Sequence, residues 1–204
     1  MDSQLRARYP ATADGQNVGE SVNPRRVTDT DPVTLLTWSQ LPEWAKDNDY
    51  ILTGFRATSN TYLSCLKSCL YIHNESGNIY SHFVATVWML ALPAYFYPFA
   101  KAHYREADTD DWIIFGFFFL GGAVCFALST GYHMVSNHSH AVHDVYHRLD
   151  LLGISTVTAG CFPPGMWYTF PCADRSTKIF WISVGGSYLS HSCLERILIF
   201  PCPS

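Results

Sequence analysis

Residues 112–132 decide the fold: they read WIIFGFFFLGGAVCFALSTGY and contain no charged side chain. A helix needs about 20 such residues to cross a bilayer core that is roughly 30 Å thick. Residues 83–100 form a second uncharged run shortly before the first. A pair of buried helices in a soluble core is the alternative. The length of both runs and the interfacial aromatic residues Trp112 and Tyr95 favour transmembrane helices.

Two further apolar runs follow toward the C-terminus. Residues 151–172 are long enough to span and include Pro163-Pro164, whose kink is tolerated where neighbouring helices cover the freed carbonyl groups. Residues 179–195 form a shorter run that ends at charged residues. We therefore predict an all-α fold, a polytopic transmembrane bundle of about four helices within residues 82–200, in an integral, multi-pass membrane protein.

The composition agrees with a membrane protein and excludes other classes. The 204 residues are 48% hydrophobic and only 15% charged, against roughly 25% charged in soluble proteins. A net charge of −4 without a basic run argues against a nucleic-acid partner. Seven cysteines without a C-x-x-C pair, several of them in apolar runs, argue against a secreted disulfide scaffold.

The N-terminal part of the chain is more polar than the rest. Residues 1–34 are rich in turn-forming residues and lack the apolar core of a signal peptide, so we predict a disordered tail. Residues 35–81 carry more large apolar side chains than a free tail would, and we predict a cytosolic and interfacial segment. Lys and Arg residues near the span ends are biased toward this side, which favours a cytosolic N-terminus.

A short helix is predicted within that segment, capped by Ser59 or Asn60. Helical spacing places three leucines on one side of this helix: Leu63, Leu66 and Leu70. An apolar stripe just before a predicted span is typical of a helix that lies in the membrane interface.

Ionisable groups at span ends are the functional candidates in a membrane protein. His133 directly continues an uncharged run, and Ser129 lies four residues earlier on the same helical face. Ser129 either orients the imidazole as a supporting hydrogen-bond partner or bonds back to the carbonyl groups of its own helix. With a cytosolic N-terminus, His133 and Asp150 lie on the same cytosolic side of neighbouring spans.

Asp150 opens the third apolar run and has two interpretations. It either caps the N-terminus of that helix, where a negative charge is favoured, or it holds a metal-bound water. Four further histidines fall in the connection between the two spans, which we expect to be a loop: His138, His140, His143 and His147. This stretch is either a neighbourhood of metal ligands or a solvated loop that is rich in histidine.

A third polar group precedes the first span, where residues 73–82 read HNESGNIYSH. Asn74, Asn78 and His82 are four residues apart and would share one helical face. The group either caps the start of a helix or forms a hydrogen-bonded network beneath a site.

Taken in order, these motifs resemble the progestin and adipoQ receptor family, which includes adiponectin receptors, fungal zinc-homeostasis (Izh-type) proteins and bacterial hemolysin III relatives. The matching segments are WAKDNDYILTGFR, SCLYIHNESGNIYSH, LSTGYHMVSNHS and RLDLLGIS. The resemblance covers about residues 38–185. HNE-x-x-NI-x-x-H joined to S-x-x-x-H is more specific than either motif alone.

The resemblance implies a seven-helix membrane protein with a cytosolic N-terminus and a zinc ion near the cytosolic face. It implies that His133 is a zinc ligand, that Asp150 contacts the zinc-bound water, and that Ser129 supports the site. In the family, two more ligands come from an H-x-x-x-H pair in the last span, but no such pair follows Asp150 here. We therefore expect a C-terminally truncated chain in which one Zn²⁺ ligand is recognisable.

Three functions follow from these observations. The favoured one is a receptor-like membrane protein linked to zinc-dependent lipid signalling or zinc and lipid homeostasis, with a membrane lipid and a lipid or protein ligand as partners. The alternative is a zinc-dependent, ceramidase-like hydrolase of a lipid amide, in which Asp150 orients the attacking water. The third is an inactive, truncated fragment. The missing H-x-x-x-H pair counts against an active hydrolase in this chain.

Overall fold

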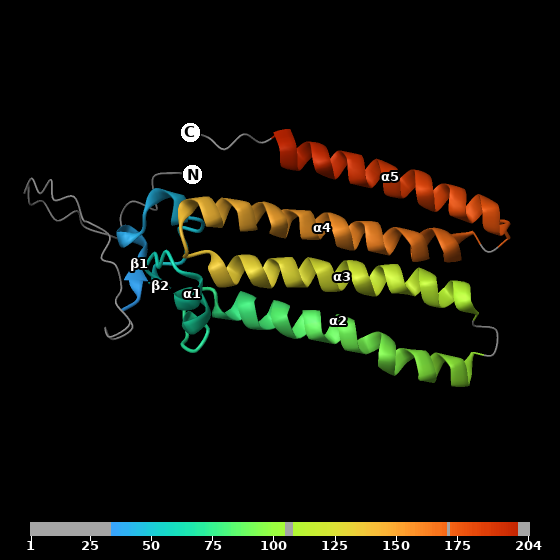
Figure 1. The fold of residues 1–204 in the computed structure, drawn as a ribbon, viewed down its shortest axis with the longest axis horizontal. Helices are drawn as coiled ribbons and strands as arrows, with labels where there is room; N and C mark the ends of the chain where they lie inside the picture. The colour runs from blue at the N-terminus through green and yellow to red at the C-terminus, as the bar shows by residue number, and fades with distance from the viewer. Residues whose placement is uncertain (1–33, 105–107, 171, 200–204) are drawn as a thin grey trace, which may run out of the picture.

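The computed structural model describes residues 34–104, 108–170 and 172–199. Within these residues, four long helices run alternately in opposite directions and lie side by side in one layer (Figure 1). Each helix packs on the next one in sequence. They are α2 (Ser76–His103), α3 (Thr109–Val135), α4 (His140–Thr169) and α5 (Arg175–Ile199). The predicted tail, residues 1–34, lies outside the described part except for its last residue.

Two of these helices are long and apolar enough to cross a membrane. They are α2 and α3, in which the most apolar stretches of 18 residues have mean hydropathies of 1.4 and 2.1. The predicted spans 83–100 and 112–132 lie inside them. The predicted spans 151–172 and 179–195 fall almost wholly on α4 and α5, but neither helix reaches the same hydropathy over its described residues.

Helix α4 begins eleven residues earlier than the sequence predicted. His140 is its first residue and Ser139 its N-cap, so most of the expected loop is helical and Asp150 does not cap an N-terminus. These two predictions were wrong because the helix extends beyond its apolar part. Its first turns are polar, and His140 pairs with Asp144 one turn later at 3.3 Å. The helix continues through Pro163-Pro164 without a break.

Close backbone contact joins α3 to α4. A Cβ atom added at Gly160 would lie 2.5 Å from the carbonyl oxygen of Phe117, and one added at Gly121 would lie 2.6 Å from that of Thr156. The Thr156 hydroxyl donates to the carbonyl oxygens of Gly153 at 2.7 Å and Gly121 at 3.3 Å. Small residues at a helix interface allow this approach in membranes, where apolar burial does little to drive helices together.

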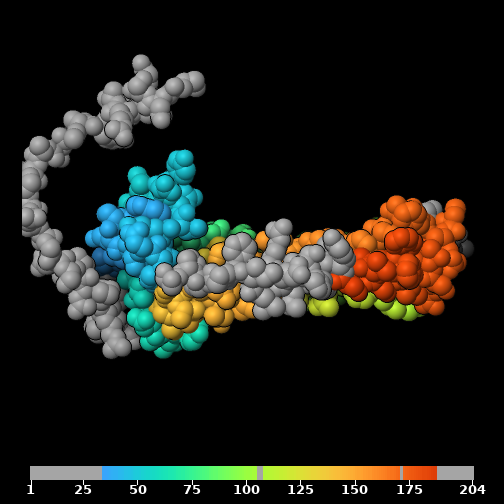
Figure 2. All heavy atoms as spheres, turned by 90° about the horizontal axis from the view of Figure 1, so that it is seen from above, coloured from blue at the N-terminus to red at the C-terminus, as the bar shows by residue number. Residues whose placement is uncertain are grey.

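The residues before α2 form an N-terminal module (residues 34–75) at one end of the helical layer, as Figure 2 shows from above. It contains two short strands, β1 (Leu36–Thr37) and β2 (Thr53–Phe55), which pair antiparallel. The other elements are two 3-10 turns, η2 (Trp38–Gln40) and η3 (Glu43–Ala45), and the helix α1 (Tyr62–Ser68). The expectation of an all-α fold was therefore wrong for this small sheet.

The predicted short helix is present as α1, but its cap lies later than expected. Thr61 is the N-cap, and its side chain accepts a hydrogen bond from the Ser64 N–H. Asn60 instead adopts a left-handed conformation, with φ 55°, and turns the chain into the helix.

A buried arginine ties the N-terminal module to the helices. Arg56 follows β2, is 5% exposed, and donates to the carbonyl oxygens of His133 at 2.7 Å and Met134 at 3.0 Å. It also donates to the hydroxyls of Ser68 on α1 at 2.8 Å and Ser136 at 2.9 Å. Arg56 thus satisfies carbonyl groups that the end of α3 leaves without an intrahelical donor.

We expect Gly160→Ala to destabilise the protein, because its methyl group would meet the backbone of α3 and force the two helices apart. Overpacking of this kind costs about 1–3 kcal/mol. Gly116→Ala is the matched control: it makes the same change on α3 at a position with no neighbouring atom within 4 Å. Thermal unfolding in detergent, followed by circular dichroism, measures both, and equal stability of the two variants would contradict close α3–α4 packing.

Arg56→Lys is expected to destabilise the fold, because an ammonium group cannot reach all four acceptors and leaves buried oxygens unpaired. The expected loss in unfolding free energy is about 2–4 kcal/mol. Arg175→Lys is the control, since Arg175 is 67% exposed and pairs with Asp110 at the surface, where a pair contributes at most about 1 kcal/mol. Similar unfolding temperatures for the two variants would mean that the Arg56 contacts carry little stability.

Candidate functional site

The start of α2 and the end of α3 meet at a polar cluster beneath the N-terminal module. Glu75 lies just before α2, and its carboxylate is 2.9 Å from Nδ1 of His133 on α3. The same carboxylate accepts hydrogen bonds from the side-chain amides of Asn78 at 2.9 Å and Asn74 at 3.1 Å. The HNESGNIYSH segment therefore forms a hydrogen-bonded network, one of the two alternatives that its sequence allowed.

The pair between Glu75 and His133 fixes the charge of the carboxylate and the orientation of the imidazole. Burial raises the pKa of Glu75, but the hydrogen bonds from His133 and Asn78 outweigh it and hold the pKa below its usual value. Glu75 is therefore an ionised acceptor at neutral pH, and His133 donates to it from Nδ1. Because Nδ1 faces Glu75, Nε2 is the ring nitrogen of His133 that is left to bind a metal, and metal binding requires the lone pair of a neutral imidazole.

Ser129 contacts a different histidine from the one that the sequence suggested. Its hydroxyl lies 2.8 Å from Nδ1 of His82 on α2, whereas the sequence placed it next to His133 on its own helix. The ring centroids of His82 and His133 are themselves 5.5 Å apart, and the edge of one ring faces the other at an interplanar angle of 61°. Ser129 thus supports the neighbourhood of His133 through His82.

Asp150 lies on the third turn of α4, at the same end of the helical layer. Its carboxylate is close enough to His82 and to Tyr132 for direct electrostatic interaction. The structure therefore brings the predicted site residues Ser129, His133 and Asp150 to one region. His82 on α2 lies beside Ser129 and His133 of α3.

The other histidines of α4 hold the N-terminal module. The Trp44 ring stacks on His140 at 5.6 Å and meets the edge of His143 at 5.5 Å. Nε2 of His143 lies 3.1 Å from the Tyr132 hydroxyl, and Asp144 contacts both histidines. These contacts give the histidines a structural role between η3 and α4.

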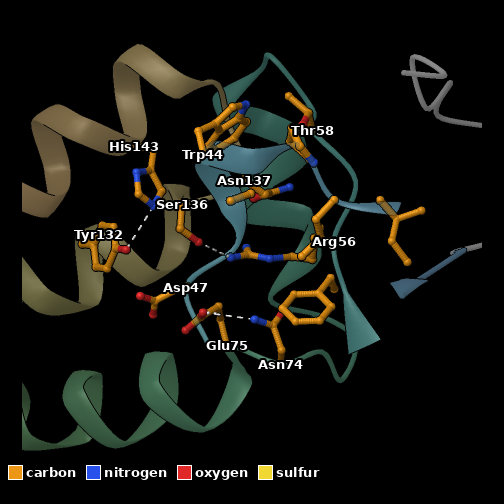
Figure 3. A pocket seen from close by; sticks show the side chains of 15 residues that line it. Trp44, Asp47, Arg56, Thr58, Asn74, Glu75, Tyr132, Ser136, Asn137 and His143 are labelled. Carbon is orange, nitrogen blue, oxygen red and sulfur yellow. Dashed lines mark hydrogen bonds between the residues drawn. The ribbon is translucent and has the colours of Figure 1, made fainter. Parts of the chain in front are cut away.

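A small cavity of about 60 Å³, partly open to solvent, lies between the N-terminal module and the helix ends (Figure 3). Arg56, Glu75, Tyr132, Asn137 and His143 are among its lining residues. Since Glu75 also contacts His133, its carboxylate connects this cavity to the histidine. Asn137 places a buried side-chain oxygen there that has no hydrogen-bond partner among the described residues.

His73 is a neutral histidine in the wall of the module. It is 6% exposed, and Nδ1 accepts a hydrogen bond from the backbone N–H of Glu75. Burial and the nearby charge of Arg56 lower its pKa to about 4. His73 therefore stays uncharged at neutral pH and positions the backbone of Glu75.

The described residues fit one side of a zinc site. A carboxylate behind a histidine is the usual arrangement around a metal ligand, because it fixes the tautomer and the ring orientation, and His133 has that arrangement with Glu75. No group of three or more His, Cys, Asp or Glu side chains within residues 34–104, 108–170 and 172–187 is placed to surround a metal.

Sequence reasoning did not name Glu75 or His82 as site residues. The signal was present, because both lie in the polar run that precedes the first span, and His82 belongs to its four-residue spacing. Their partners, His133 and Ser129, lie 58 and 47 residues away in the chain, so the pairing depends on the packing of α2 against α3.

Comparison with known proteins agrees with the resemblance seen in the sequence. A family model described as Haemolysin-III related matches residues 70–194. Progestin and adipoQ receptor-like protein 1 of Caenorhabditis elegans is 33% identical over 150 residues, which are 74% of this chain and 34% of the relative. The Adiponectin receptor protein of Drosophila melanogaster is 32% identical over 147 residues, which are 72% of this chain and 32% of the relative.

Progestin and adipoQ receptor family member 3 of Homo sapiens is 32% identical over 153 residues, which are 74% of this chain and 49% of the relative. The chain thus spans a third to a half of the length of these curated relatives. The matched region contains α2, α3, α4 and most of α5, and with them His82, Ser129, His133 and Asp150. The chain belongs to the haemolysin-III-related family of membrane proteins, together with these progestin and adipoQ receptor-like relatives.

Proposed function

We propose that this chain is an integral, multi-pass, receptor-like membrane protein that takes part in zinc-dependent lipid signalling or in zinc and lipid homeostasis. The observation that carries the proposal is the pair formed by Glu75 and His133. An ionised carboxylate holds a histidine at the end of a membrane-length helix, Nε2 of this histidine has no hydrogen-bond partner among the described residues, and Asp150 lies nearby. The names of the relatives, which include an adiponectin receptor protein, support the receptor-like part.

The proposed topology has α2 to α5 as four spans and the N-terminal module in the cytosol. Two basic residues of the module, Arg56 and Lys67, precede α2 closely, and Arg148 lies near the start of α4 at the same end. The opposite end, between α2 and α3, carries Lys101 and Arg105 among acidic residues. The excess of Lys and Arg on the side of the module, which supports this orientation, is therefore small.

In the proposed site, His133 is a zinc ligand and each neighbouring residue has one task. Glu75 fixes the tautomer and direction of the imidazole. Ser129 holds His82 in place beside it. Asp150 orients a water molecule and accepts its proton. Zinc, when bound, supplies an electrophile that acidifies water and polarises a carbonyl group. A complete coordination sphere needs ligands beyond the described residues, since catalytic zinc usually has three from protein.

A second candidate function is hydrolysis of a lipid amide at the same site. The observation that favours it is the position of Asp150, which is half-buried and acts electrostatically on His82 and Tyr132. A carboxylate in that position can serve as a general base toward water. The apolar outer surface of α2 borders the site on one side and suits an acyl chain.

We expect the purified protein to contain zinc and His133→Ala to lose it. Glu75→Gln should weaken zinc binding by about 10–100-fold, because the variant no longer fixes the imidazole with a charged acceptor. His103→Ala is the matched control, since His103 lies at the far end of α2 and contacts the Phe99 carbonyl oxygen of its own helix. Metal analysis per chain measures all four proteins. Equal zinc in His133→Ala and wild type would refute the assigned ligand, and no zinc in the wild type would leave an inactive fragment.

The hydrolase candidate predicts a separate result for Asp150. Asp150→Asn should retain zinc but lose turnover of a ceramide presented in mixed micelles, because it removes the base and not the ligand. Ceramide turnover that survives both Asp150→Asn and His133→Ala would exclude hydrolysis at this site while leaving the zinc measurement unaffected.

A further inference from the structure

We propose that α1, with the residues that join it to α2, docks onto the bilayer surface and inserts Leu63, Leu66 and Leu70 among the acyl chains below the headgroups. The docking surface consists of these three leucines together with Ile72, and its partner is the lipid of the leaflet that meets the start of α2. The inference concerns a membrane contact of the N-terminal module and does not rest on the proposed zinc site.

In α1, small residues are buried and leucines are exposed, which is the reverse of the pattern in a helix of a soluble protein. Its buried residues are the small Cys65 and Ser68, at 0% and 1% exposure, whereas Leu63 and Leu66 are 61% and 52% exposed. Soluble helices turn their apolar stripe toward the core and their polar face toward water. The outward stripe of α1 therefore fits an apolar medium and not water.

Hydrogen bonds fix this orientation from the inside. The Ser68 hydroxyl accepts from the Arg56 guanidinium at 2.8 Å and donates to the Cys65 carbonyl at 2.6 Å. The Cys65 thiol lies 3.2 Å from the Ser59 hydroxyl. Rotating α1 to bury its leucines would break these bonds and leave the buried Arg56 guanidinium without its hydrogen bond to Ser68. The leucines therefore have to be covered from outside.

The docking surface continues into the membrane-length part of α2. After α1, Leu70 and Ile72 are 88% and 87% exposed, and the first turns of α2 then present Tyr80, Phe83 and Val84 outward. The Tyr80 hydroxyl donates to the carbonyl oxygen of Cys69, which attaches the end of α1 to α2. Figure 1 shows α1 directly beside the start of α2. The lipid that surrounds α2 thus lies next to the leucines, with the long side chain of Lys67 among them able to extend toward the headgroups.

Aromatic hydroxyl groups mark the polar boundary at the same level. Tyr62 at the start of α1 and Tyr80 on α2 are both about half exposed, and tyrosines of this kind gather where acyl chains meet headgroups. Because Arg56 bonds both Ser68 on α1 and the carbonyl of His133, docking of α1 also sets the depth of His133 below the leaflet surface.

The test places a spin label at single positions of the full chain in phosphatidylcholine vesicles. A ketone-bearing amino acid at position 66 or 70 carries the label and leaves the seven native cysteines in place. Collision with oxygen, which concentrates in lipid, is compared with collision with a water-soluble nickel chelate. Position 43 is the matched control, because the Glu43 side chain is 89% exposed on the N-terminal module.

We expect labels at 66 and 70 to collide mainly with oxygen, and the label at 43 to collide mainly with the nickel chelate. Two labelled positions guard against failure of one variant to fold, and a monodisperse elution in detergent confirms folding of each. Dominant nickel collisions at 66 and 70 would show a surface in water. Low collision rates with both reagents would show a surface covered by protein. Either result overturns the proposal, and repeating the measurement in His133→Ala separates it from the zinc site.

Discussion

The guanidinium of Arg56 is the contact on which the arrangement of the site depends. A helix that ends inside a protein leaves carbonyl groups without donors, and leaving them unpaired in a low-dielectric environment is costly. Arg56 supplies two of those donors to the end of α3 and two more to hydroxyls on α1 and after α3. Burial lowers the pKa of Arg56, while the Glu75 carboxylate opposes this effect. One positive charge therefore holds the module, the helix end and the acidic side of the site together.

The site combines a charged pair with neutral neighbours. Glu75 is ionised and holds His133 by a hydrogen bond. His73, which accepts a hydrogen bond from the backbone N–H of Glu75, stays neutral because burial and the charge of Arg56 disfavour its protonated form. Hydrogen bonds and burial thus keep Glu75 and His73 each in a single protonation state at neutral pH. Such fixed polar networks hold one geometry more firmly than isolated contacts do.

The sequence predicted the parts of the fold that depend on local composition. The uncharged run of residues 112–132 required a membrane-length helix, and α3 contains it. The small sheet could not be predicted, since strands of two and three residues have no pattern of their own and exist because Leu36 and Phe55 pair. Helix α4 was predicted too short, since hydropathy shows where a helix crosses lipid and not where its hydrogen bonds begin.

For the candidate site, too, the sequence predicted some features and missed others. His133, Ser129 and Asp150 were predicted because spacing and resemblance single them out, and packing brings them to one end of the layer. The contacts that these residues make were not predicted. Ser129 contacts His82 and His133 contacts Glu75, and both contacts depend on the packing of α2 against α3. One-dimensional spacing gives neighbours on the same helix, whereas a membrane bundle makes its polar contacts between helices.

The glycine contact between α3 and α4 has a consequence for how the protein is made. These helices are joined by residues 136–139 alone, and their backbones touch at Gly121 and Gly160. Contacts between sequence neighbours form early, because little loop entropy opposes them. We expect the two helices to leave the translocon as a preassembled hairpin, before synthesis of the following helix is finished. Helix α5, which is synthesised last of the four, would then pack onto a helix pair that is already assembled.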